Sequence, residues 1–445
     1  MTAPVKMRFL RRIVLTTALA LAQTLLVPNA VNAQTFSVIH TFTGGTDGGI
    51  PIAGLTIDSA GNLYGTTVGG GMRKPACGGS FGCGVVFKLS QHNGSWVLST
   101  LYQFRAGNDG AGPVSRVIFG PNGRLYGTTE VGGIGCTDNT GCGTVFSLAP
   151  PITVCRSIIC SWTETVLYRF TGASDGANPL SEVVFDRAGN LYGTTFGGGL
   201  VNCYVPPQGC GVVYELSPSQ GNWTQTALYR FTGGVDGGNP QSEVVFDNPG
   251  NIYGTTLDYG NCCGTVFELT PNGSQWTENT IYSFTGGFDG GAPSAGLTFD
   301  QSGNLYGAAS SGGDDNGGTA FTLVRDPGGW NYGRLYGAFQ NPNGYDLNGP
   351  SSTLVYDRST GNLYGTTWGD GPLNFGSVFR LTQSGGNWTY TSLYDFTGGS
   401  DGAHPYGRVV LDSHGNLYGT AEAGGVGGCS GDDFGCGVVY KIALN

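Results

Sequence analysis

The chain is poor in charged residues and above all in histidine. Charged residues make up 11% of its 445 residues, and histidine occurs four times, at His40, His92, His404 and His414. A structural zinc site needs four clustered ligands, and a Ser-His-Asp relay needs a histidine next to its partners. Because the four histidines are scattered and none neighbours a cysteine pair, the sequence predicts neither zinc binding nor a histidine-based hydrolase.

Basic residues are also scarce, with 20 Lys and Arg against 30 Asp and Glu. Nucleic-acid binding needs a basic face that neutralises phosphates, and anionic lipid surfaces attract basic clusters. We therefore expect no nucleic-acid partner and no membrane insertion. The acidic balance is otherwise typical of a soluble protein, which we expect to be a monomer.

Long hydrophobic runs are absent after the first 33 residues. Basic residues from Lys6 to Arg12 precede the apolar run 13–27, and Ala33 ends a small-residue cleavage motif before Gln34. This order is typical of a secretory signal peptide. The sequence therefore predicts cleavage near Ala33, a single mature domain over residues 34–445, and a secreted or periplasmic location.

Glycine, in contrast, is abundant, with 82 residues and no triplet period, which excludes collagen. A hydrophobic fraction of 39% and an aromatic fraction of 12% are enough for a packed core, so disorder is not expected. The glycines recur at fixed positions of a repeat. Its core motif, Gly-Asn-Leu-Tyr-Gly-Thr-Thr with variants, occurs at 61–67, 123–129, 189–195, 250–256, 303–309, 361–367 and 415–421.

One repeat predicts four short strands. In the first repeat these are Gly54–Asp58, Leu63–Thr67, Gly84–Leu89 and Trp96–Phe104, separated by glycine-rich or polar turns. Four antiparallel strands within about 55–65 residues form one blade of a β-propeller, which must stack on its neighbours to bury its faces. We therefore predict an all-β, seven-bladed propeller.

The seventh repeat lacks its fourth strand, because the chain ends soon after 438–442. Residues 36–42 match the missing strand and precede the first repeat. Pairing this segment beside 438–442 closes the ring and removes two open sheet edges. The N-terminal strand is therefore predicted to complete the last blade.

The units resemble the GloVer-type tandem repeat of exported bacterial proteins. The resemblance covers nearly all of residues 36–445 and is carried by Phe-Thr-Gly-Gly-x-Asp-Gly, Asp-x-x-Gly-Asn-Leu-Tyr-Gly-Thr-Thr and Gly-Val-Val-Phe-x-Leu. The Asp-x-x-Gly-Asn-Leu-Tyr turn is also similar to the NHL propeller repeat. Members of the GloVer family often carry a C-terminal sorting anchor, but this chain ends at Asn445, so release is expected rather than surface display. The resemblance implies no catalytic residues.

Twelve cysteines form six close pairs, as an exported, disulfide-bonded chain would have. The pairs are Cys77/Cys83, Cys136/Cys142, Cys155/Cys160, Cys203/Cys210, Cys262/Cys263 and Cys429/Cys436. Five of them lie in the loop between the second and third strands, and we expect them to stiffen it. Cys262 and Cys263 are adjacent, which predicts a vicinal disulfide, with free thiols or a metal site as alternatives.

Loops that join the second strand to the third, and one blade to the next, should share one face of the disc, which we take as the functional face. Each Asp-Gly loop there carries an aspartate, which either caps a turn amide or holds Ca²⁺. These aspartates are Asp47, Asp109, Asp175, Asp236, Asp289 and Asp401. The aspartates of the opposite hairpins are predicted turn formers: Asp58, Asp186, Asp247, Asp300, Asp357 and Asp412.

Residues that break the sevenfold pattern are the better site candidates. The position that opens the inner strand, at the mouth of the central channel, holds Gly54, Arg116, Glu182, Glu243, Gly296, Thr353 and Arg408. The four charges form either a salt-bridged plug between blades or a polar ligand site. Around the mouth, the variable loops supply Tyr204, Tyr259 and Trp368, whose aromatic rings suit a sugar or a peptide.

These features favour a secreted binding or scaffold protein that presents disulfide-tied loops to a glycan, peptide or surface partner. The candidate ligand-binding residues are Arg116, Glu182, Glu243, Arg408, Tyr204, Tyr259 and Trp368. The alternative is a propeller enzyme, of the polysaccharide lyase or glycosidase type, that uses the carboxylates at the channel mouth. A purely structural module is the third hypothesis. No catalytic residue and no cofactor is predicted, apart from the Ca²⁺ alternative.

Overall fold

The computed structural model describes residues 34–74, 77, 81–133, 136, 141–151, 162–200, 203, 209–340, 348–425, 428–429 and 435–444. The predicted signal peptide, 1–33, lies outside these residues. In the part of the chain that is described, no helix is long and apolar enough to cross a membrane.

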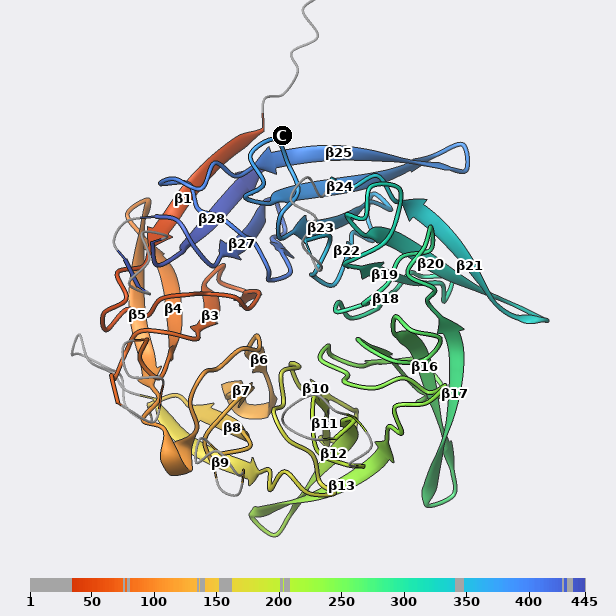
Figure 1. Cartoon of the computed structure of the whole chain (residues 1–445). Coiled ribbons are helices and arrows are strands. Elements are labelled where there is room, and N and C mark those ends of the chain that lie inside the picture. The colour runs from red at the N-terminus through yellow and green to blue at the C-terminus, as the bar shows by residue number, and fades with distance from the viewer. Residues whose placement is uncertain are drawn as a thin grey trace, which may run out of the picture.

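Seven four-stranded antiparallel sheets are arranged in a ring around a central axis (Figure 1). Blade 1 consists of β2 (Thr56–Ile57), β3 (Leu63–Thr67), β4 (Val85–His92) and β5 (Ser95–Gln103), hydrogen-bonded in that order from the axis outward. The predicted seven-bladed propeller is confirmed. Two 3₁₀ turns, Gly107–Asp109 and Pro121–Gly123, are the helical elements of the described chain.

Blades 2 to 6 repeat this arrangement. Blade 2 contains β6 (Ile118–Phe119), β7 (Leu125–Thr129), β8 (Thr144–Ala149) and β9 (Thr163–Arg169). Blade 3 contains β10 (Val184–Phe185), β11 (Leu191–Thr195), β12 (Val212–Ser219) and β13 (Asn222–Arg230). Blade 4 contains β14 (Val245–Phe246), β15 (Ile252–Thr256), β16 (Thr265–Asn272) and β17 (Gln275–Ser283). Blade 5 contains β18 (Thr298–Phe299), β19 (Leu305–Ala309), β20 (Thr319–Asp326) and β21 (Gly329–Tyr336). Blade 6 contains β22 (Val355–Tyr356), β23 (Leu363–Thr367), β24 (Ser377–Ser384) and β25 (Asn387–Asp395).

Blade 7 is completed by the N-terminal strand. β26 (Val410–Leu411), β27 (Leu417–Ala421) and β28 (Val438–Ala443) are followed by β1 (Thr35–Thr41), which lies antiparallel to β28 (Figure 1). Phe36 of β1 stacks on Tyr394 of blade 6 with ring centroids 3.6 Å apart. The predicted closure of the ring is therefore confirmed, and β28 is paired on both sides instead of forming the edge of a three-stranded blade.

The inner strands are shorter than predicted. In blade 1 only Thr56 and Ile57 pair with β3, although Gly54–Asp58 was predicted as strand. Gly54 instead lies against the next blade, where an added Cβ would be 2.7 Å from the carbonyl oxygen of Arg408. At the narrow centre of the ring, the first residues of the inner strand therefore contact the neighbouring blade instead of pairing with β3.

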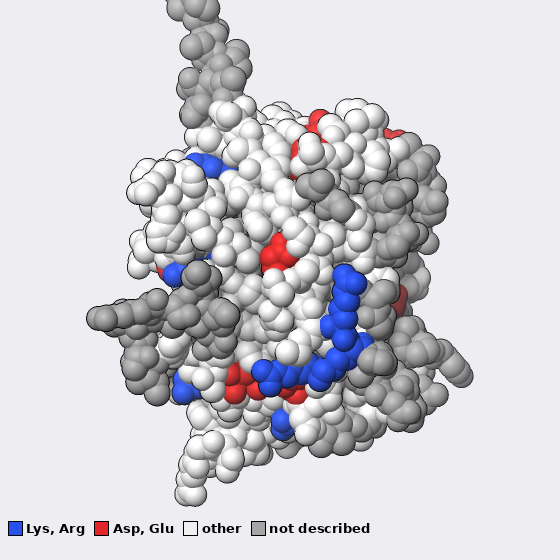
Figure 2. Space-filling model, turned by 90° about the vertical axis from the view of Figure 1, so that its left-hand side faces the viewer, with Lys and Arg blue, Asp and Glu red and all other residues white. Residues whose placement is uncertain are grey.

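The hydrophobic core lies between neighbouring blades rather than within them. Phe42 packs edge-on against Phe87 with centroids 5.2 Å apart, and Phe104 packs in the same way against Phe146 in the next interface at 5.1 Å. All four rings are fully buried. Figure 2 shows one outer side of the ring, where uncharged residues cover most of the described surface and charged residues gather in a few clusters.

The disc has two different faces. Bridges such as Gly49–Gly69 and Ala177–Gly197 join each blade-to-blade loop to the loop between the second and third strands, so these loops share one face, as predicted. We call it the loop face. The opposite side, the turn face, carries the short hairpins between first and second strands and between third and fourth strands.

Candidate functional site

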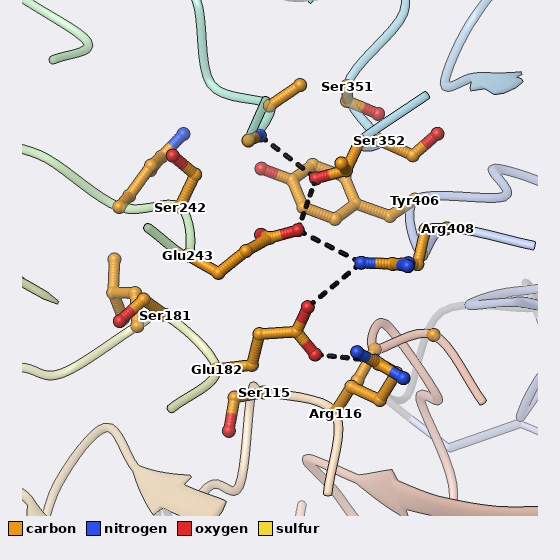
Figure 3. Close-up of a pocket in the computed structure, with 18 of the residues that line it drawn as sticks. Ser115, Arg116, Ser181, Glu182, Ser242, Glu243, Ser351, Ser352, Tyr406 and Arg408 are labelled. Carbon is orange, nitrogen blue, oxygen red and sulfur yellow. Dashed lines mark hydrogen bonds and ion pairs between the residues drawn. The ribbon is translucent and has the colours of Figure 1, made fainter. Parts of the chain in front are cut away.

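A small cavity of about 100 Å³ lies on the propeller axis, and every blade contributes to its lining. It holds the residues that open the inner strands, where the chain leaves the loop face and turns down towards the short strand. Four of the predicted ligand-binding residues, Arg116, Glu182, Glu243 and Arg408, come together here (Figure 3). Its volume has room for a few water molecules rather than for a sugar ring.

These four residues form one chain of ion pairs. Glu182 binds Arg116 Nε at 2.5 Å with one oxygen and Arg408 Nη1 at 3.2 Å with the other. Arg408 Nη1 also lies 3.2 Å from Glu243 (Figure 3). Both glutamates are more than nine-tenths buried as whole residues. The two positive and two negative charges balance, so the cluster presents no net charge to a ligand.

Hydrogen bonds extend this cluster to all seven blades. Thr353 of blade 6 donates to Glu243 at 2.8 Å and accepts from the Gly296 amide of blade 5 at 3.0 Å. Arg116 Nη1 donates to Thr56 of blade 1 at 3.2 Å. The asymmetric residues therefore tie the ring together at its centre, which is the geometry of the predicted salt-bridged plug. Ligand binding by these residues stays a prediction.

The two glutamates have pKa values that move in opposite directions. Burial raises the pKa of Glu182, but the charges of Arg116 and Arg408 outweigh it and leave this pKa below its usual value. Burial and the neighbouring charge of Glu182 raise the pKa of Glu243, against the opposing effects of Arg408 and Thr353. Such a pair is typical of acid–base chemistry as well as of buried ion-pair networks.

The Asp-Gly aspartates cap turns. Asp175 accepts hydrogen bonds from the Thr171 amide at 2.9 Å, the Thr171 hydroxyl at 2.5 Å and the Tyr168 hydroxyl at 3.0 Å. Tyrosine–aspartate bonds of the same kind occur at Asp109, Asp236, Asp289 and Asp401. The oxygens of these carboxylates are therefore used in hydrogen bonds within the protein. In the part of the chain that the structure describes, no group of three His, Cys, Asp or Glu side chains is placed to hold a metal ion.

The hairpin aspartates are turn formers, as predicted. Asp58 accepts from the amides of Ala60 and Asn62, from the Asn62 side chain and from the Tyr64 hydroxyl, at 2.8 to 3.1 Å. Burial raises the pKa of Asp58, but these hydrogen bonds outweigh it and lower the pKa overall. The motif Asp-x-x-Gly-Asn-Leu-Tyr is therefore a self-contained turn and not a site.

Five of the six predicted disulfides are present: Cys77–Cys83, Cys136–Cys142, Cys203–Cys210, Cys262–Cys263 and Cys429–Cys436. The vicinal disulfide is thus confirmed, and Cys155 and Cys160 lie outside the described residues. The disulfide sulfurs pack closely against a glycine of the neighbouring blade-to-blade loop. At Gly44, for example, a Cβ atom would lie only 2.5 Å from Cys429 Sγ, so a larger residue does not fit there. In blade 6, which has no cysteine pair, the ring of Phe375 fills this position, 2.6 Å from a Cβ at Gly398.

A second cavity, of about 250 Å³, opens on the loop face beside blade 6. We call it the Trp368 cavity; it is lined by Asn348, Trp368, Gly369, Leu373, Asn374, Phe375 and His404. The rings of Trp368 and His404 stack with centroids 4.0 Å apart and planes 16° apart. Trp368 Nε1 donates to Glu422 at 2.9 Å, which fixes the indole.

His404 occupies a position where blades 3 and 4 have asparagine. Asn178 and Asn239 each use the side-chain amide to donate to a carbonyl of the preceding blade. His404 Nδ1 makes the same bond to the Trp368 carbonyl at 2.8 Å, and its Nε2 remains an acceptor in the neutral ring. Burial lowers the pKa of His404 against the opposing effect of the bond to the Trp368 carbonyl, and the lowered pKa favours the neutral ring.

Of the remaining predicted aromatic residues, Tyr259 lines neither the central cavity nor the Trp368 cavity. Tyr259 forms bridges with Cys262 and Cys263, and its ring lies against Gly238, 2.8 Å from an added Cβ. Tyr204 lies outside the described residues. The sequence singled out Trp368 and His404 separately but not their contact, because 36 residues separate them and the register of two blades brings them together.

Solved structures similar to this chain have low sequence identity to it. The chain is similar to a putative 6-phosphogluconolactonase from Bacteroides uniformis, with 15% identity, TM-score 0.48, and 76% of this chain and 84% of that chain covered. It is also similar to a putative glucose dehydrogenase-type oxidoreductase from Thermus thermophilus, with 15% identity, TM-score 0.42, and coverage of 92% and 100%. A protein from Lactobacillus plantarum gives 14% identity, TM-score 0.47, and coverage of 76% and 84%. At these levels the likeness carries no argument about function.

A search of curated proteins gives no match. The family model described as the Gloeobacter/Verrucomicrobia repeat matches residues 28–162 and 153–340. These matches cover most of the chain and contain the Gly-Asn-Leu-Tyr-Gly-Thr-Thr motifs of the first five blades. The chain therefore belongs to the Gloeobacter/Verrucomicrobia repeat family.

Proposed function

We propose that this protein is an exported binding propeller that takes one unit of a neutral glycan into the Trp368 cavity. The observation that carries the proposal is the cavity itself, in which a fixed indole, a neutral imidazole and an exposed leucine surround about 250 Å³. Pockets for drug-sized ligands run from about 300 to 1,000 Å³. The Trp368 cavity is slightly smaller and suits a single sugar ring.

The chemistry of the lining supports a sugar. Sugar rings have apolar C–H faces that pack on aromatic side chains, and hydroxyls that both donate and accept hydrogen bonds. Phe375 and Leu373, a residue that is 54% exposed, supply apolar surface beside Trp368. Asn374 and the Nε2 atom of His404 supply polar partners without charge, which favours a neutral ligand over an acidic one.

Export is supported by the cysteines and by the leader. Disulfides form and persist in oxidising compartments, and the structure contains five of them. The pattern of residues 1–33 is that of a signal peptide.

The enzyme alternative places catalysis at Glu182 and Glu243. Both side chains are at most 11% exposed and both are ion-paired with Arg408, so a substrate would have to break the central network to reach them. Separating a buried ion pair leaves an uncompensated charge and costs about 3–5 kcal/mol. This barrier is why we favour binding over turnover.

Calorimetric titration of neutral oligosaccharides into three variants tests the proposal. Trp368→Ala should weaken binding at least tenfold, because it removes the stacking surface. His404→Asn keeps the bond to the Trp368 carbonyl, as Asn178 and Asn239 do in their blades, and should still weaken binding about threefold or more.

Phe196→Ala is the matched control, because Phe196 occupies the repeat position of Trp368 in blade 3 and lines none of the Trp368 cavity. It should bind as the wild type does. Equal affinity of Trp368→Ala and Phe196→Ala would refute the proposal, and release of reducing ends by the wild type but not by Glu243→Gln would favour the enzyme.

A further inference from the structure

A groove of about 610 Å³ lies on the turn face, between the hairpins of blades 4, 5 and 6. It is larger than the Trp368 cavity and lies on the opposite side of the disc. All the residues that line it are described in the structure. We call it the Arg325 groove. Its volume lies in the range that accommodates ligands of several rings.

The wall of the groove departs from the repeat at Arg325, whose position holds glutamine or proline in blades 1, 3, 4 and 6. The position of Glu268 varies between blades and is also glutamate, Glu215, in blade 3. Blades 1 and 7 have a lysine at the position of Glu268, and each lysine lies over the tyrosine of its own blade, at 5.4 and 5.7 Å from the ring centroid. In blade 4, Glu268 instead accepts a hydrogen bond from Tyr253 at 2.5 Å. Arg325 of blade 5 lies 3.8 Å from Glu268 and over the ring of Trp330 at 5.4 Å.

The groove therefore combines aromatic rings with planar polar groups. Trp330 packs edge-on against Tyr253 with centroids 5.8 Å apart, and Phe299 packs edge-on against the same tyrosine at 5.4 Å. Arg325 keeps its side chain 57% exposed. Arg358, in the next hairpin, is exposed and has no partner for its guanidinium among the described residues.

The aspartate carboxylates of the groove already accept hydrogen bonds within their own turns. Asp247 accepts four hydrogen bonds within its own turn, including those from the Asn251 amide and side chain at 2.8 Å. Asp300 accepts four in the same way within the next turn. Arg325 Nη1 donates to the Tyr253 hydroxyl at 3.5 Å and pairs with Glu268, and Gln301 Nε2 donates to the Arg358 carbonyl at 3.5 Å. The donors that remain for a ligand are the guanidinium of Arg358 and the other nitrogens of Arg325. Because the two arginines face three carboxylates, the groove has no excess of positive charge for an anion.

We propose that the Arg325 groove binds a neutral oligosaccharide segment, with sugar faces on the aromatic wall and hydroxyls hydrogen-bonded to Arg325 and Arg358. Arginine offers five donors in a fixed planar fork, which suits paired ring hydroxyls as it suits other bidentate acceptors. The ligand class follows from the mixture of rings, free donors and balanced charge.

Together with the Trp368 cavity this makes the disc bivalent across its thickness, so that one molecule bridges two glycan chains. The bridging rests on the proposed function, whereas binding in the Arg325 groove does not. Two binding faces on one rigid ring raise avidity for a polysaccharide surface without any new contact.

The test uses the mature protein and neutral hexasaccharides, cellohexaose, xylohexaose and mannohexaose, with a hexauronate for comparison. Calorimetry should give two sites per chain for the wild type. The double variant R325A/R358A should lose one site, with affinity there reduced at least tenfold, and Trp368→Ala should lose the other. Beads coated with the hexasaccharide should be cross-linked by the wild type and by neither variant.

Arg187→Ala is the matched control, because Arg187 is exposed at the turn position of Arg358 in blade 3 and does not line the groove. It should keep both sites. If R325A/R358A shows the same two sites as Arg187→Ala, the proposed binding in the Arg325 groove is refuted, while the proposed site at the Trp368 cavity is unaffected. Loss of all binding in R325A/R358A but none in Trp368→Ala refutes the proposed function and keeps the groove. Binding of the hexauronate alone, abolished by salt, refutes the neutral-ligand assignment.

Discussion

At the scale of single residues, the threonine after the repeat glycine links each blade to the next. Its hydroxyl donates to a backbone carbonyl of the following blade at 2.7 to 3.3 Å in six blades, as Thr194 does to Ser242. The others are Thr66, Thr128, Thr255, Thr366 and Thr420. Ala308 replaces it in blade 5. These bonds lie in the buried centre, so each satisfies a carbonyl that water does not reach.

Thr194→Val should lower the free energy of unfolding by about 1–3 kcal/mol, because it leaves the Ser242 carbonyl without its buried donor. Thr226→Val, on the exposed outer strand β13, is the control and should change stability by less than about 0.5 kcal/mol. Urea unfolding of both variants is the measurement. Equal midpoints would show that the inter-blade bond contributes nothing.

Glu164 of β9 gives the fold a specific pH dependence. Burial, together with the charge of Asp109, raises the pKa of Glu164 to about 7. The folded state therefore holds this proton more tightly than the unfolded chain does, so the contribution of Glu164 to stability is present at acidic pH and is lost as the pH rises towards 7.

Glu164→Gln should therefore melt at the same temperature as the wild type at pH 4 and roughly 1–2 °C higher at pH 8. Thermal unfolding followed by circular dichroism across this range is the measurement. A variant that melts lower than the wild type at pH 8 would contradict the assigned direction.

At the scale of elements, the disulfides and the ring of Phe375 fill equivalent positions, each packed against the glycine of a blade-to-blade loop. The loop that Cys203–Cys210 closes is eight residues long, and both cysteines are at most 2% exposed. Replacing both by alanine should cost about 2–3 kcal/mol, mostly through a less constrained unfolded chain.

The double alanine variant of Cys262 and Cys263 is the comparison, because a disulfide between neighbours closes almost no loop. It should cost clearly less in guanidinium unfolding. A larger loss for the vicinal pair would mean that packing, and not loop closure, is what these disulfides supply.

The sequence predicted the second and third strands closely, since each is anchored by the Leu-Tyr-Gly-Thr-Thr or Val-Phe-x-Leu pattern. β3 has the predicted bounds Leu63–Thr67, and β4 begins one residue after the predicted start at Gly84. The inner strands were predicted too long. Contacts with the neighbouring blade determine the conformation of their first residues. The sequence pattern of a single repeat holds no information about those contacts.

At the scale of the whole molecule, repeat counting and the displaced strand predicted the number of blades and the closure. Both follow from a local motif that recurs. The four charged residues of the mouth were also found, since they break the sevenfold pattern. Their pairing was not predictable in detail, because Arg408 and Glu182 are 226 residues apart. The Arg325 groove was missed for the same reason, since three hairpins from three blades build it.

The structure is a closed ring with a buried ion-pair network at its centre, and the Trp368 cavity and the Arg325 groove lie on its two faces. The central cavity of about 100 Å³ is small and ion-paired, whereas the Trp368 cavity of about 250 Å³ is aromatic and uncharged. This contrast is the reason why we propose ligand binding in the Trp368 cavity instead of catalysis at the channel mouth.

The most direct test is a crystal structure of the protein in complex with a neutral oligosaccharide that it binds. We predict a sugar ring against Trp368 and His404 on the loop face, with the Arg116–Glu182–Arg408–Glu243 ion pairs intact. A sugar lodged between Glu182 and Glu243 with Arg408 displaced, and no sugar at Trp368, would contradict the account.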